Sequence, residues 1–263
     1  MGRSRGALFI GTSGWHYRHW RGTFYPDRLP TSRWFTYYRS VFSSVEMNAT
    51  FYRLPTVQAV LAWKNQAPPG FLYAIKGSRF ITHNKKLSDP LPSLRRFRDV
   101  ISHLGQTLAV ILFQLPPSWG PNLPRLAEFL AAYRRIFPTT RMCLEFRNQQ
   151  WYGAETQRML RDAGIGFCIY HLAGHDSPRL VTADFAYVRL HGSGSRYSGS
   201  YDAAALQPWA DRIRSWRAQG IDCFCYFDND IGGDAPRDAA LLRTLAREDG
   251  DPLPNHAVDA MLS

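Results

Sequence analysis

Eight short apolar runs recur along the chain, and most of them are separated by a stretch of helical length. Each run is rich in β-branched, aromatic or other apolar residues and is bounded by Gly, Pro or polar clusters, which is typical of a fully buried strand. The predicted strands are Ala7–Ser13, Phe42–Asn48, Phe71–Lys76, Leu108–Leu115, Met142–Arg147, Gly166–His171, Phe185–His191 and Cys223–Asp228. Buried strands that alternate with helices predict an α/β fold with a parallel sheet.

Amphipathic stretches between the runs predict seven helices. They cover Ser32–Ser40, Val57–Gln66, Leu91–Leu104, Pro124–Phe137, Ala154–Ala163, Ala203–Gln219 and Ala235–Arg247. Pro124 and Pro236 suit the first turn of a helix, and Asp202 is a candidate N-cap. Gly164 and Gly220 follow predicted helix ends, where a left-handed residue commonly terminates a helix.

The connection Leu172–Asp184 is too short and too rich in Gly, Pro and Asp to hold a proper helix. The other connections carry one each, so the pattern is an eight-fold β-α alternation with a missing or short sixth helix. A (β/α)₈ barrel typically has about 250 residues. No Pro/Gly/Ser-rich linker or low-complexity segment interrupts the 263 residues. We therefore predict a single TIM-type barrel domain over residues 1–263.

Charged or polar residues occupy the last positions of seven runs, where a buried strand should carry none. They are Glu46 with Asn48, Lys76, Gln114, Glu145 with Arg147, His171, Arg189 with His191, and Asp228 with Asn229. A charge that faced the outer helices would lose its water without gaining a partner. Residues two apart share one face of a strand, so we expect these groups to converge at the C-terminal mouth of the barrel. The alternative is a ring of salt bridges that only fills the barrel.

The chain is strongly basic, with a formal net charge of +11 and a pI near 9.8. This balance favours anionic partners, including nucleic acid. Arginine outnumbers lysine 28 to 4, and clusters such as Arg95-Arg96-Phe97-Arg98 lie on predicted amphipathic helices. A solvated outer face is therefore the competing interpretation.

The remaining composition indicates an ordinary soluble protein. Cys143, Cys168, Cys223 and Cys225 all lie in predicted strands, where a buried thiol serves as a small apolar residue. The apolar run after Met1 is too short for a signal peptide, and no run has transmembrane length. We expect a cytoplasmic location.

Several motifs along the chain belong together. They are Gly11-Thr-Ser-Gly-Trp-His-Tyr, Trp20-Arg-Gly-Thr-Phe-Tyr-Pro, Val45-Glu-Met-Asn-Ala-Thr-Phe-Tyr-Arg-Leu-Pro, Phe80-Ile-Thr-His with Lys86-Leu, Gln114-Leu-Pro-Pro-Ser, Glu145-Phe-Arg with Trp151, Val188-Arg-Leu-His-Gly and Tyr226-Phe-Asp-Asn-Asp. In this order the chain resembles the YecE-like family, catalogued as domain of unknown function 72. The resemblance implies a TIM-type barrel with a site at these strand ends, and it specifies no reaction.

The chain departs from the family pattern at three positions. Asn148 and Gln150 stand where relatives often have His and Ser, and Asp228 stands where Asn is common. The resemblance therefore implies that a substrate bound at these positions would be selected differently here.

Four residues are candidates for catalysis. Glu145 and Glu46 are carboxylates that neighbouring cations would hold ionised, as a base requires. His191 is a candidate acid or base near neutral pH, and Lys76 adds positive charge. The candidates for substrate binding are Arg147, Arg189, Asn48, Gln114, Trp15, Tyr17, His83, Trp151, Tyr201, Asp228 and Asn229. Cations outnumber acids in this set, which suits a phosphate or carboxylate substrate.

Two loops and an aromatic segment add to the site. The Gly/Ser-rich loop after Gly192 and the Gly232-Gly233 pair follow the last two strands, where barrels often bind phosphate; the first loop could also be a lid or a plain linker. Twelve aromatic residues between Trp15 and Tyr52 alternate with arginines, which suits stacking on bases or packing in the core. Cofactors are unknown. A divalent metal held by acids and histidines from different strands is not favoured, because no zinc-type spacing occurs.

Three classes of function remain. The favoured one is an enzyme that acts on an anionic substrate, such as a phosphoester or nucleic acid, at the barrel mouth. The second is a carbohydrate-active enzyme that uses Glu46 and Glu145 as its carboxylate pair. The third is a non-catalytic nucleic-acid-binding protein. An anionic small molecule or nucleic acid is the expected partner, no membrane is expected, and the oligomeric state is not indicated.

Overall fold

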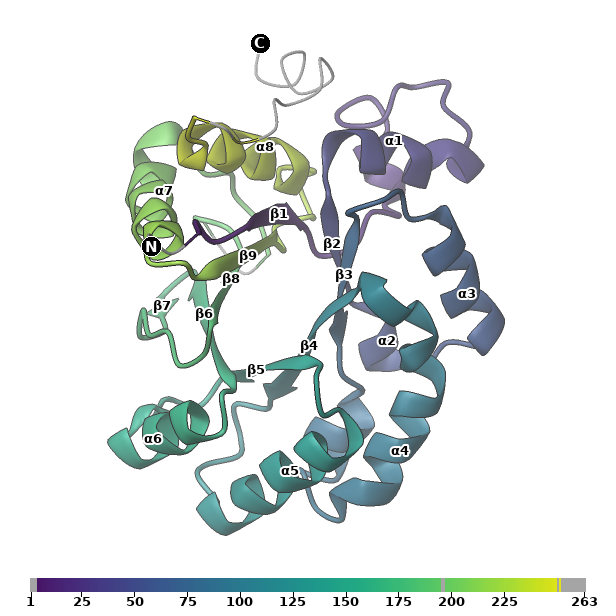
Figure 1. The fold of residues 1–263 in the computed structure, drawn as a ribbon. Coiled ribbons are helices and arrows are strands. Elements are labelled where there is room, and N and C mark those ends of the chain that lie inside the picture. The colour runs from purple at the N-terminus through teal and green to yellow at the C-terminus, as the bar shows by residue number, and fades with distance from the viewer. Residues whose placement is uncertain (1–3, 195–196, 250, 252–263) are drawn as a thin grey trace. The chain divides into compact units, whose positions relative to one another are not determined.

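The structure is a computed structural model that describes residues 4–194, 197–249 and 251. Strands and helices alternate through nearly all of this part of the chain (Figure 1). The strands are β1 Leu8–Thr12, β2 Ser44–Met47, β3 Leu72–Lys76, β4 Leu108–Leu115, β5 Arg141–Phe146, β6 Gly166–Leu172, β7 His175–Asp176, β8 Phe185–Leu190 and β9 Asp222–Phe227. All eight predicted strands are present, and only the two-residue β7 was not foreseen.

The strand order is that of a TIM-type (β/α)₈ barrel. The sheet runs β1-β9-β8-β6-β5-β4-β3-β2, with β7 attached to β6. Consecutive strands are thus neighbours, and the last strand lies beside the first in parallel register. An isolated parallel bridge joins Ser13 after β1 to Glu46 in β2. The fold class predicted from the sequence is confirmed.

Apart from the four-residue helix Ala49–Tyr52, which was not foreseen, the helices of the described chain lie at the predicted positions with end shifts of a few residues. They are α1 Trp34–Val41, α2 Ala49–Tyr52, α3 Val57–Gln66, α4 Pro90–Ile101, α5 Leu123–Ile136, α6 Ala154–Asp162, α7 Ala203–Ala218 and α8 Ala235–Ala246. The Asp202 side chain accepts a hydrogen bond from Ala205 N at 2.8 Å, so it is the N-cap of α7. Gly164 and Gly220 adopt φ values of 61° and 81° and terminate α6 and α7. Short helical turns not foreseen in the sequence include the π-helix Phe80–Asn84.

The connection between β6 and β8 contains no helix, as predicted. The chain turns at Gly174, whose φ is 79°, and β7 pairs back on β6 in antiparallel register. Two buried hydroxyl side chains then complete hydrogen bonds of the β6 segment. Ser177 accepts from Tyr170 N at 2.7 Å, and Thr182 accepts from Phe167 N at 2.8 Å. Side chains of the connection therefore satisfy buried backbone groups that would be costly to leave unpaired.

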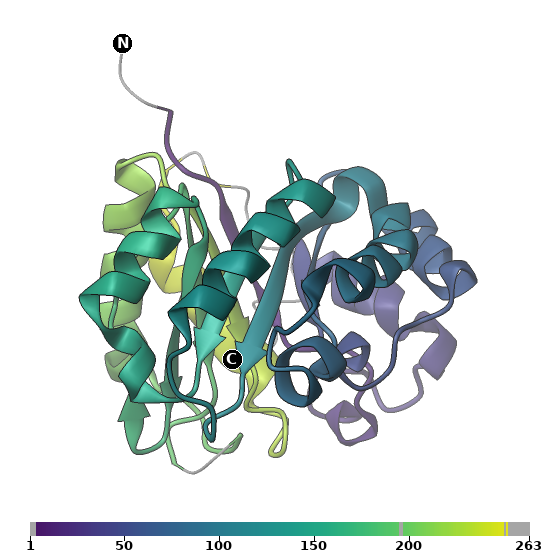
Figure 2. The ribbon, with the colours of Figure 1, turned by 90° about the horizontal axis from the view of Figure 1, so that it is seen from below.

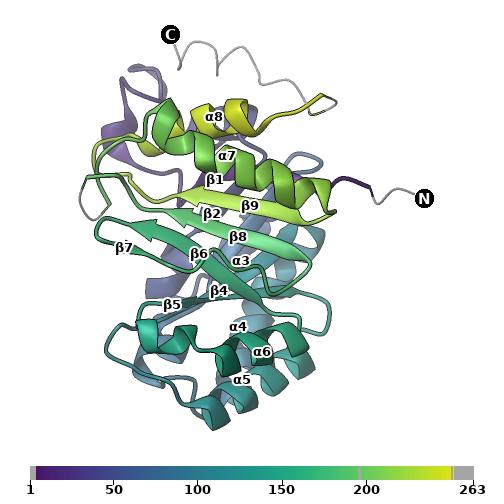
Figure 3. The ribbon, with the colours of Figure 1, turned by 90° about the vertical axis from the view of Figure 1, so that its left-hand side faces the viewer.

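The chain packs as two compact units. Unit 1 comprises Met1–Glu46, Ile169–Ser177 and Asp184–Ser263, and unit 2 comprises Met47–Cys168 and Pro178–Ala183. The prediction of a single domain stays a prediction. In unit 1, α7 and α8 lie side by side, with α8 packed on β1 and β9 (Figure 3). In unit 2, α4 and α5 lie side by side, and β3, β4 and β5 run parallel (Figure 1 and Figure 2).

Much of the aromatic segment after β1 belongs to the core of unit 1. Trp20, Tyr25, Trp34 and Tyr38 are fully buried. Tyr25 stacks on Trp34 with ring centroids 4.6 Å apart. Aromatic side chains bury large areas and pair in such geometries, so packing explains most of the aromatic content that the sequence also allowed as a stacking surface.

Candidate functional site

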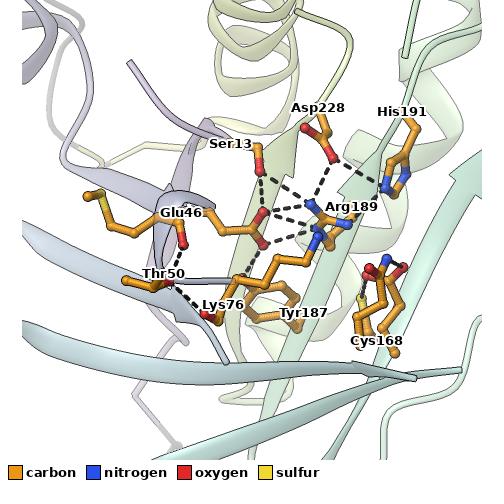
Figure 4. A network of polar contacts seen from close by, with 12 residues as sticks. Ser13, Glu46, Thr50, Lys76, Cys168, Tyr187, Arg189, His191 and Asp228 are labelled. Carbon is orange, nitrogen blue, oxygen red and sulfur yellow. Dashed lines mark hydrogen bonds and ion pairs between the residues drawn. The ribbon is translucent and has the colours of Figure 1, made fainter. Parts of the chain in front are cut away.

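Arg189 lies at the centre of a buried polar network in unit 1. The side chain projects from β8, is fully buried, and hydrogen-bonds to two carboxylates (Figure 4). Its Nη2 donates to Glu46 at 2.7 Å and to Asp228 at 2.8 Å. Opposite charges and several hydrogen bonds offset the cost of removing these ions from water. The pairing makes Arg189 a structural cation rather than the anion clamp that we predicted.

Both oxygens of the Glu46 carboxylate accept hydrogen bonds inside the fold. Its carboxylate accepts from the Ser13 hydroxyl, from Tyr187 OH at 2.6 Å and from Arg189 Nε at 3.0 Å (Figure 4). Burial raises the pKa of Tyr187 well above its ordinary value, and the Glu46 charge raises it further, so the tyrosine stays a donor. A carboxylate with this set of donors has little basicity left for a substrate. The geometry therefore argues against Glu46 as a catalytic base and against a glycosidase pair that includes it.

The imidazole of His191 has three partners close to its ring nitrogens. Arginine has no acceptor, so the 2.9 Å contact from Arg189 Nη1 requires a lone pair on His191 Nε2. The Nδ1 atom lies 3.1 Å from the His171 carbonyl oxygen and must donate to it. Asp228 Oδ2 lies 3.6 Å from the same Nε2, so both ring nitrogens have partners inside the network. This arrangement does not support His191 as the acid or base.

Asp228 is the carboxylate of this network that reaches solvent. Its side chain is 10% exposed, whereas those of Glu46 and Arg189 are 0% exposed. Tyr17 lies nearby, and its hydroxyl donates to the Ser13 carbonyl at 2.7 Å. Burial raises the pKa of Tyr17, and Asp230, Asp228 and Glu46 raise it further. Trp15 is half-buried against Phe35, with ring centroids 4.8 Å apart.

A second cluster of polar side chains in unit 1 holds the loop after β8 in place through hydrogen bonds. Tyr201 OH accepts from Gly192 N at 3.1 Å and lies 2.6 Å from His171 Nδ1. Asn229 Nδ2 donates to the Gly199 carbonyl at 3.0 Å and to Asp238 at 2.8 Å. Tyr201 and Asn229, which we predicted to bind substrate, are both buried and hold this loop in place. Ser195 and Arg196 of the predicted loop lie outside the described residues.

Unit 2 holds its own group of predicted residues at the strand ends. Glu145 in β5 is fully buried and accepts from Gln114 Nε2 at 2.7 Å and from Arg147 Nε. Cys168 Sγ lies 3.8 Å from the same carboxylate. The Arg147 side chain is 10% exposed. Glu145 thus orients Arg147, whose side chain is only slightly exposed.

Lys76 and His83 meet around one aromatic ring of unit 2. Lys76 Nζ lies 4.5 Å from the centroid of the Phe51 ring, and the His83 ring lies 5.1 Å from it. His83 Nδ1 is 2.9 Å from the Thr82 hydroxyl. Burial lowers the pKa of His83, Lys76 and Arg79 lower it further, and Glu145 opposes them. The imidazole is therefore neutral at pH 7 beside two cations.

The predicted site residues thus form two groups. Unit 1 joins Glu46, Arg189, His191 and Asp228, and unit 2 joins Gln114, Glu145 and Arg147, with Lys76 and His83 sharing the Phe51 ring. The first network pairs the carboxylates of Glu46 and Asp228 with Arg189. In unit 2, Lys76 and Arg147 accompany Glu145, and the predicted excess of cations over the whole set stays a prediction.

Trp151 and Asn48, which we also predicted to bind substrate, belong to neither group. Trp151 is fully buried, stacks on Phe146 and donates its indole N–H to the Trp119 carbonyl at 2.8 Å. Its contacts are those of a packed core residue, and the predicted role in substrate binding stays a prediction. Asn48 is half-buried at the start of α2.

Sequence reasoning missed three residues of the two polar groups in unit 1. Tyr187 lies two positions before Arg189, so strand parity could have placed it on the same face. Ser13 ends β1 within the Gly-Thr-Ser-Gly motif. Asp238 is a carboxylate on the buried face of α8, and a polar residue in an apolar stripe is the signal that could have revealed it.

Neither metal-type clusters nor membrane-spanning helices occur among the residues that the structure describes. Within 4–194, 197–249 and 251, no three His, Cys, Asp or Glu side chains are grouped to hold a metal ion. No helix in this part of the chain is long and apolar enough to cross a bilayer.

Comparison with known proteins places the chain in a family. Residues 9–260 match the family model described as protein of unknown function DUF72. The chain belongs to the DUF72 family. DUF72 relatives include the protein YunF of Bacillus subtilis, 24% identical over 87% of this chain and 90% of the relative. The protein YecE of Escherichia coli is 29% identical over 59% of this chain and 54% of the relative.

A solved DUF72 structure agrees with the fold. The crystal structure of a DUF72 family protein from Thermotoga maritima is 27% identical, with a TM-score of 0.83, and the match covers 92% of this chain and 100% of that one. The resemblance read from the sequence motifs is thereby confirmed.

Proposed function

We propose that this DUF72 protein is an enzyme that acts on an anionic substrate, such as a phosphoester, at the ends of β3, β4 and β5. Lys76 and Arg147 would bind the anion, and His83 would act as the general base. The observation that carries the proposal is a neutral imidazole beside Lys76 and Arg79. A cationic environment attracts an anion and also keeps a nearby base unprotonated.

The parallel register supports the proposal because it brings the ends of β3, β4 and β5 to one edge of unit 2. Lys76 pairs with Leu112, and Gln114 pairs with Glu145 in adjacent parallel strands. Lys76 is 8% exposed and Gln114 is 9% exposed. A partly covered cation interacts more strongly with an anion than one in bulk water. Arginine adds a planar fork that suits two phosphate oxygens.

The hydrogen bonds of His83 support a role as base. The Thr82 hydroxyl lies 2.9 Å from Nδ1 and 3.5 Å from the Ser78 carbonyl. When Thr82 donates to that carbonyl, it accepts from Nδ1–H, and the lone pair then lies on Nε2. A half-buried imidazole in this tautomer can accept a proton from water or from a substrate hydroxyl.

Turnover of phosphate monoesters and diesters by the full chain tests the proposal, with and without Mg²⁺ or Mn²⁺. His83→Gln should lower kcat by about 10²- to 10⁴-fold with little change in KM. Lys76→Met should mainly raise KM. His103→Gln is the matched control, because His103 lies on a different short helix, with Nδ1 3.2 Å from the Val100 carbonyl. Equal turnover by His83→Gln and wild type would remove His83 from the mechanism.

A further inference from the structure

The charge of the chain is distributed unevenly along the sequence. From Met47 to Ser88 there is no Asp or Glu, although the whole chain has 21 acidic residues. The same stretch contains all four lysines of the protein and two arginines. Its cations are Arg53, Lys64, Lys76, Arg79, Lys85 and Lys86. A long acid-free stretch with this many cations favours polyanions over small neutral ligands.

The exposed aromatic side chains lie in this same stretch. Tyr52 at the end of α2 is 71% exposed, and Phe80 at the start of the π-helix is 52% exposed. Among the described residues, the other exposed large apolar side chains are Leu61 and Ile231. More than half of each of these two side chains is in contact with solvent and not with the folded chain. Both rings are therefore available to a ligand that stacks.

Contacts connect the two rings to the cations of unit 2. Tyr52 packs edge-on against Phe51, with ring centroids 5.1 Å apart, and Phe51 contacts His83 at 5.1 Å. His83 and Phe80 belong to the same π-helix. Lys85 Nζ lies 5.9 Å from the Phe80 ring centroid and forms an ion pair with Asp89 at 3.0 Å, so Lys86 and Arg79 carry the charge that the surface offers. The Arg79 side chain is exposed and makes no ion pair or hydrogen bond with the described part of the chain.

The backbone that carries these groups is strained. A π-helix is rare and often marks a functional site. The turn after it places Lys86, Leu87 and Asp89 at φ values of 46°, 65° and 43°, in the left-handed region. Such residues cost free energy and persist only where their surroundings demand them. The buried Leu87 donates its N–H to the Ile81 carbonyl at 2.9 Å, which fixes the turn against the π-helix.

We propose that Tyr52, Phe80, Arg79 and the Lys85–Lys86 pair form a binding surface for single-stranded nucleic acid. Bases stack on Tyr52 and Phe80, and Arg79 and Lys86 contact the phosphates between them. Isolated aromatics interleaved with cations are the usual means of holding single strands without sequence preference. The four-residue α2 and the π-helix do not present the continuous apolar face that a membrane-surface helix needs. The assignment rests on the proposed function, since it names the anionic substrate that would reach Lys76 and His83.

Fluorescence anisotropy with a labelled oligothymidylate of about 12 nucleotides tests this surface in the full chain. Tyr52→Ala and Phe80→Ala should each weaken binding at least about fivefold, since each removes a stacking platform. Arg79→Gln should weaken binding and reduce its dependence on salt between about 50 mM and 200 mM. Leu61→Ala and Lys64→Gln are the matched controls, because both alter side chains of α3 in the same acid-free stretch. Both controls should bind as wild type does.

The outcomes separate this inference from the proposed function. Absence of binding at low salt, or equal binding by wild type and both aromatic variants, would overturn the surface. If phosphoester turnover by wild type still depended on His83 in that case, the proposed function would stand alone. Oligonucleotide binding that needs Tyr52 and Phe80, without any turnover, would support the surface and contradict the enzyme. Equal or tighter binding to a duplex of the same length, or to anionic lipid vesicles, would also overturn the assignment to single strands.

Discussion

Arg189 shows how a strongly charged residue at a barrel strand end can serve stability. It is among the largest fully buried side chains of the described chain. Its guanidinium nitrogens contact Glu46, Asp228, Ser13 and His191. Each of these partners depends on the same cation, so removing it would leave two carboxylates without compensation inside the fold.

We expect Arg189→Met to lower the free energy of unfolding by about 3–5 kcal/mol, because an uncompensated buried charge is strongly destabilising. Urea denaturation monitored by tryptophan fluorescence measures the change. Arg98→Met on the exposed side of α4 should change stability by no more than about 0.5 kcal/mol. Equal stability of the two variants would show that the buried network contributes little.

Asp238 is the second residue with a testable electrostatic role. It is buried and accepts hydrogen bonds from Tyr201 N at 2.9 Å and Asn229 Nδ2 at 2.8 Å. Burial raises the pKa of this carboxyl from 3.8 to about 6, against those hydrogen bonds and Arg237. A raised pKa means that the folded protein binds the proton more tightly than the unfolded chain does.

The stability contributed by the Asp238 proton should therefore be complete below pH 3.8 and be lost as pH rises through about 6. A shift of this size corresponds to about 3 kcal/mol. Unfolding measured from pH 4.5 to 7.5 should show wild type losing stability relative to Asp238→Asn, which has no proton to lose. Parallel pH profiles for the two proteins would contradict the raised pKa.

At the scale of elements, the loop after β8 depends on one backbone position. Gly192 has a φ of 106°, in the left-handed region that favours glycine. A Cβ there would lie 2.1 Å from the Ser198 carbonyl oxygen. The loop ends are held by Tyr201 and Asn229. The conformation of the loop therefore depends on close backbone approach as well as on these side chains.

Gly192→Ala should displace the segment around Ser198. An alanine in the left-handed region alone costs about 1 kcal/mol, and we expect this variant to be destabilised by more than that. Gly174→Ala separates the two effects, since Gly174 has a φ of 79° but a Cβ there meets no atom within 4 Å. Hydrogen exchange of the loop amides, together with melting temperature, measures both. If the two variants lost similar amounts of stability, the loop would be able to relieve the clash at Gly192 without further destabilising the protein.

At the scale of the whole molecule, the cysteines and arginines lie where the sequence predicted them, the cysteines in the interior and most of the clustered arginines at the surface. The four cysteines are free and buried, as the strand assignments required. Burial raises the pKa of the Cys223 thiol to about 12, which keeps it protonated and inert near neutral pH. The net charge of +11 is carried largely by arginines, and Arg95, Arg96 and Arg98 on α4 are exposed, which agrees with a solvated outer face. The uneven part of the charge is the acid-free stretch of unit 2.

The sequence alone determined the strands, the helices and the strand order, because these depend on local patterns and on short connections. Alternation, caps such as Asp202 and left-handed residues such as Gly164 act within a few positions. Even the absent sixth helix followed from the length and composition of Leu172–Asp184. Strand parity also placed Glu46, Arg189 and His191 on inward faces.

Only the tertiary structure decided what those inward groups do. Glu46 and Arg189 are 143 positions apart, and Ser13 and Arg189 are 176 apart. Whether a carboxylate can act as a base depends on how many hydrogen-bond donors from distant parts of the sequence already contact it. The same holds for Trp151, whose burial no local pattern reveals, and for His83, whose lowered pKa comes first from burial in the tertiary structure. Hydrogen-bond and charge pairing are set by distances between segments far apart along the chain, and a one-dimensional pattern carries no such distances.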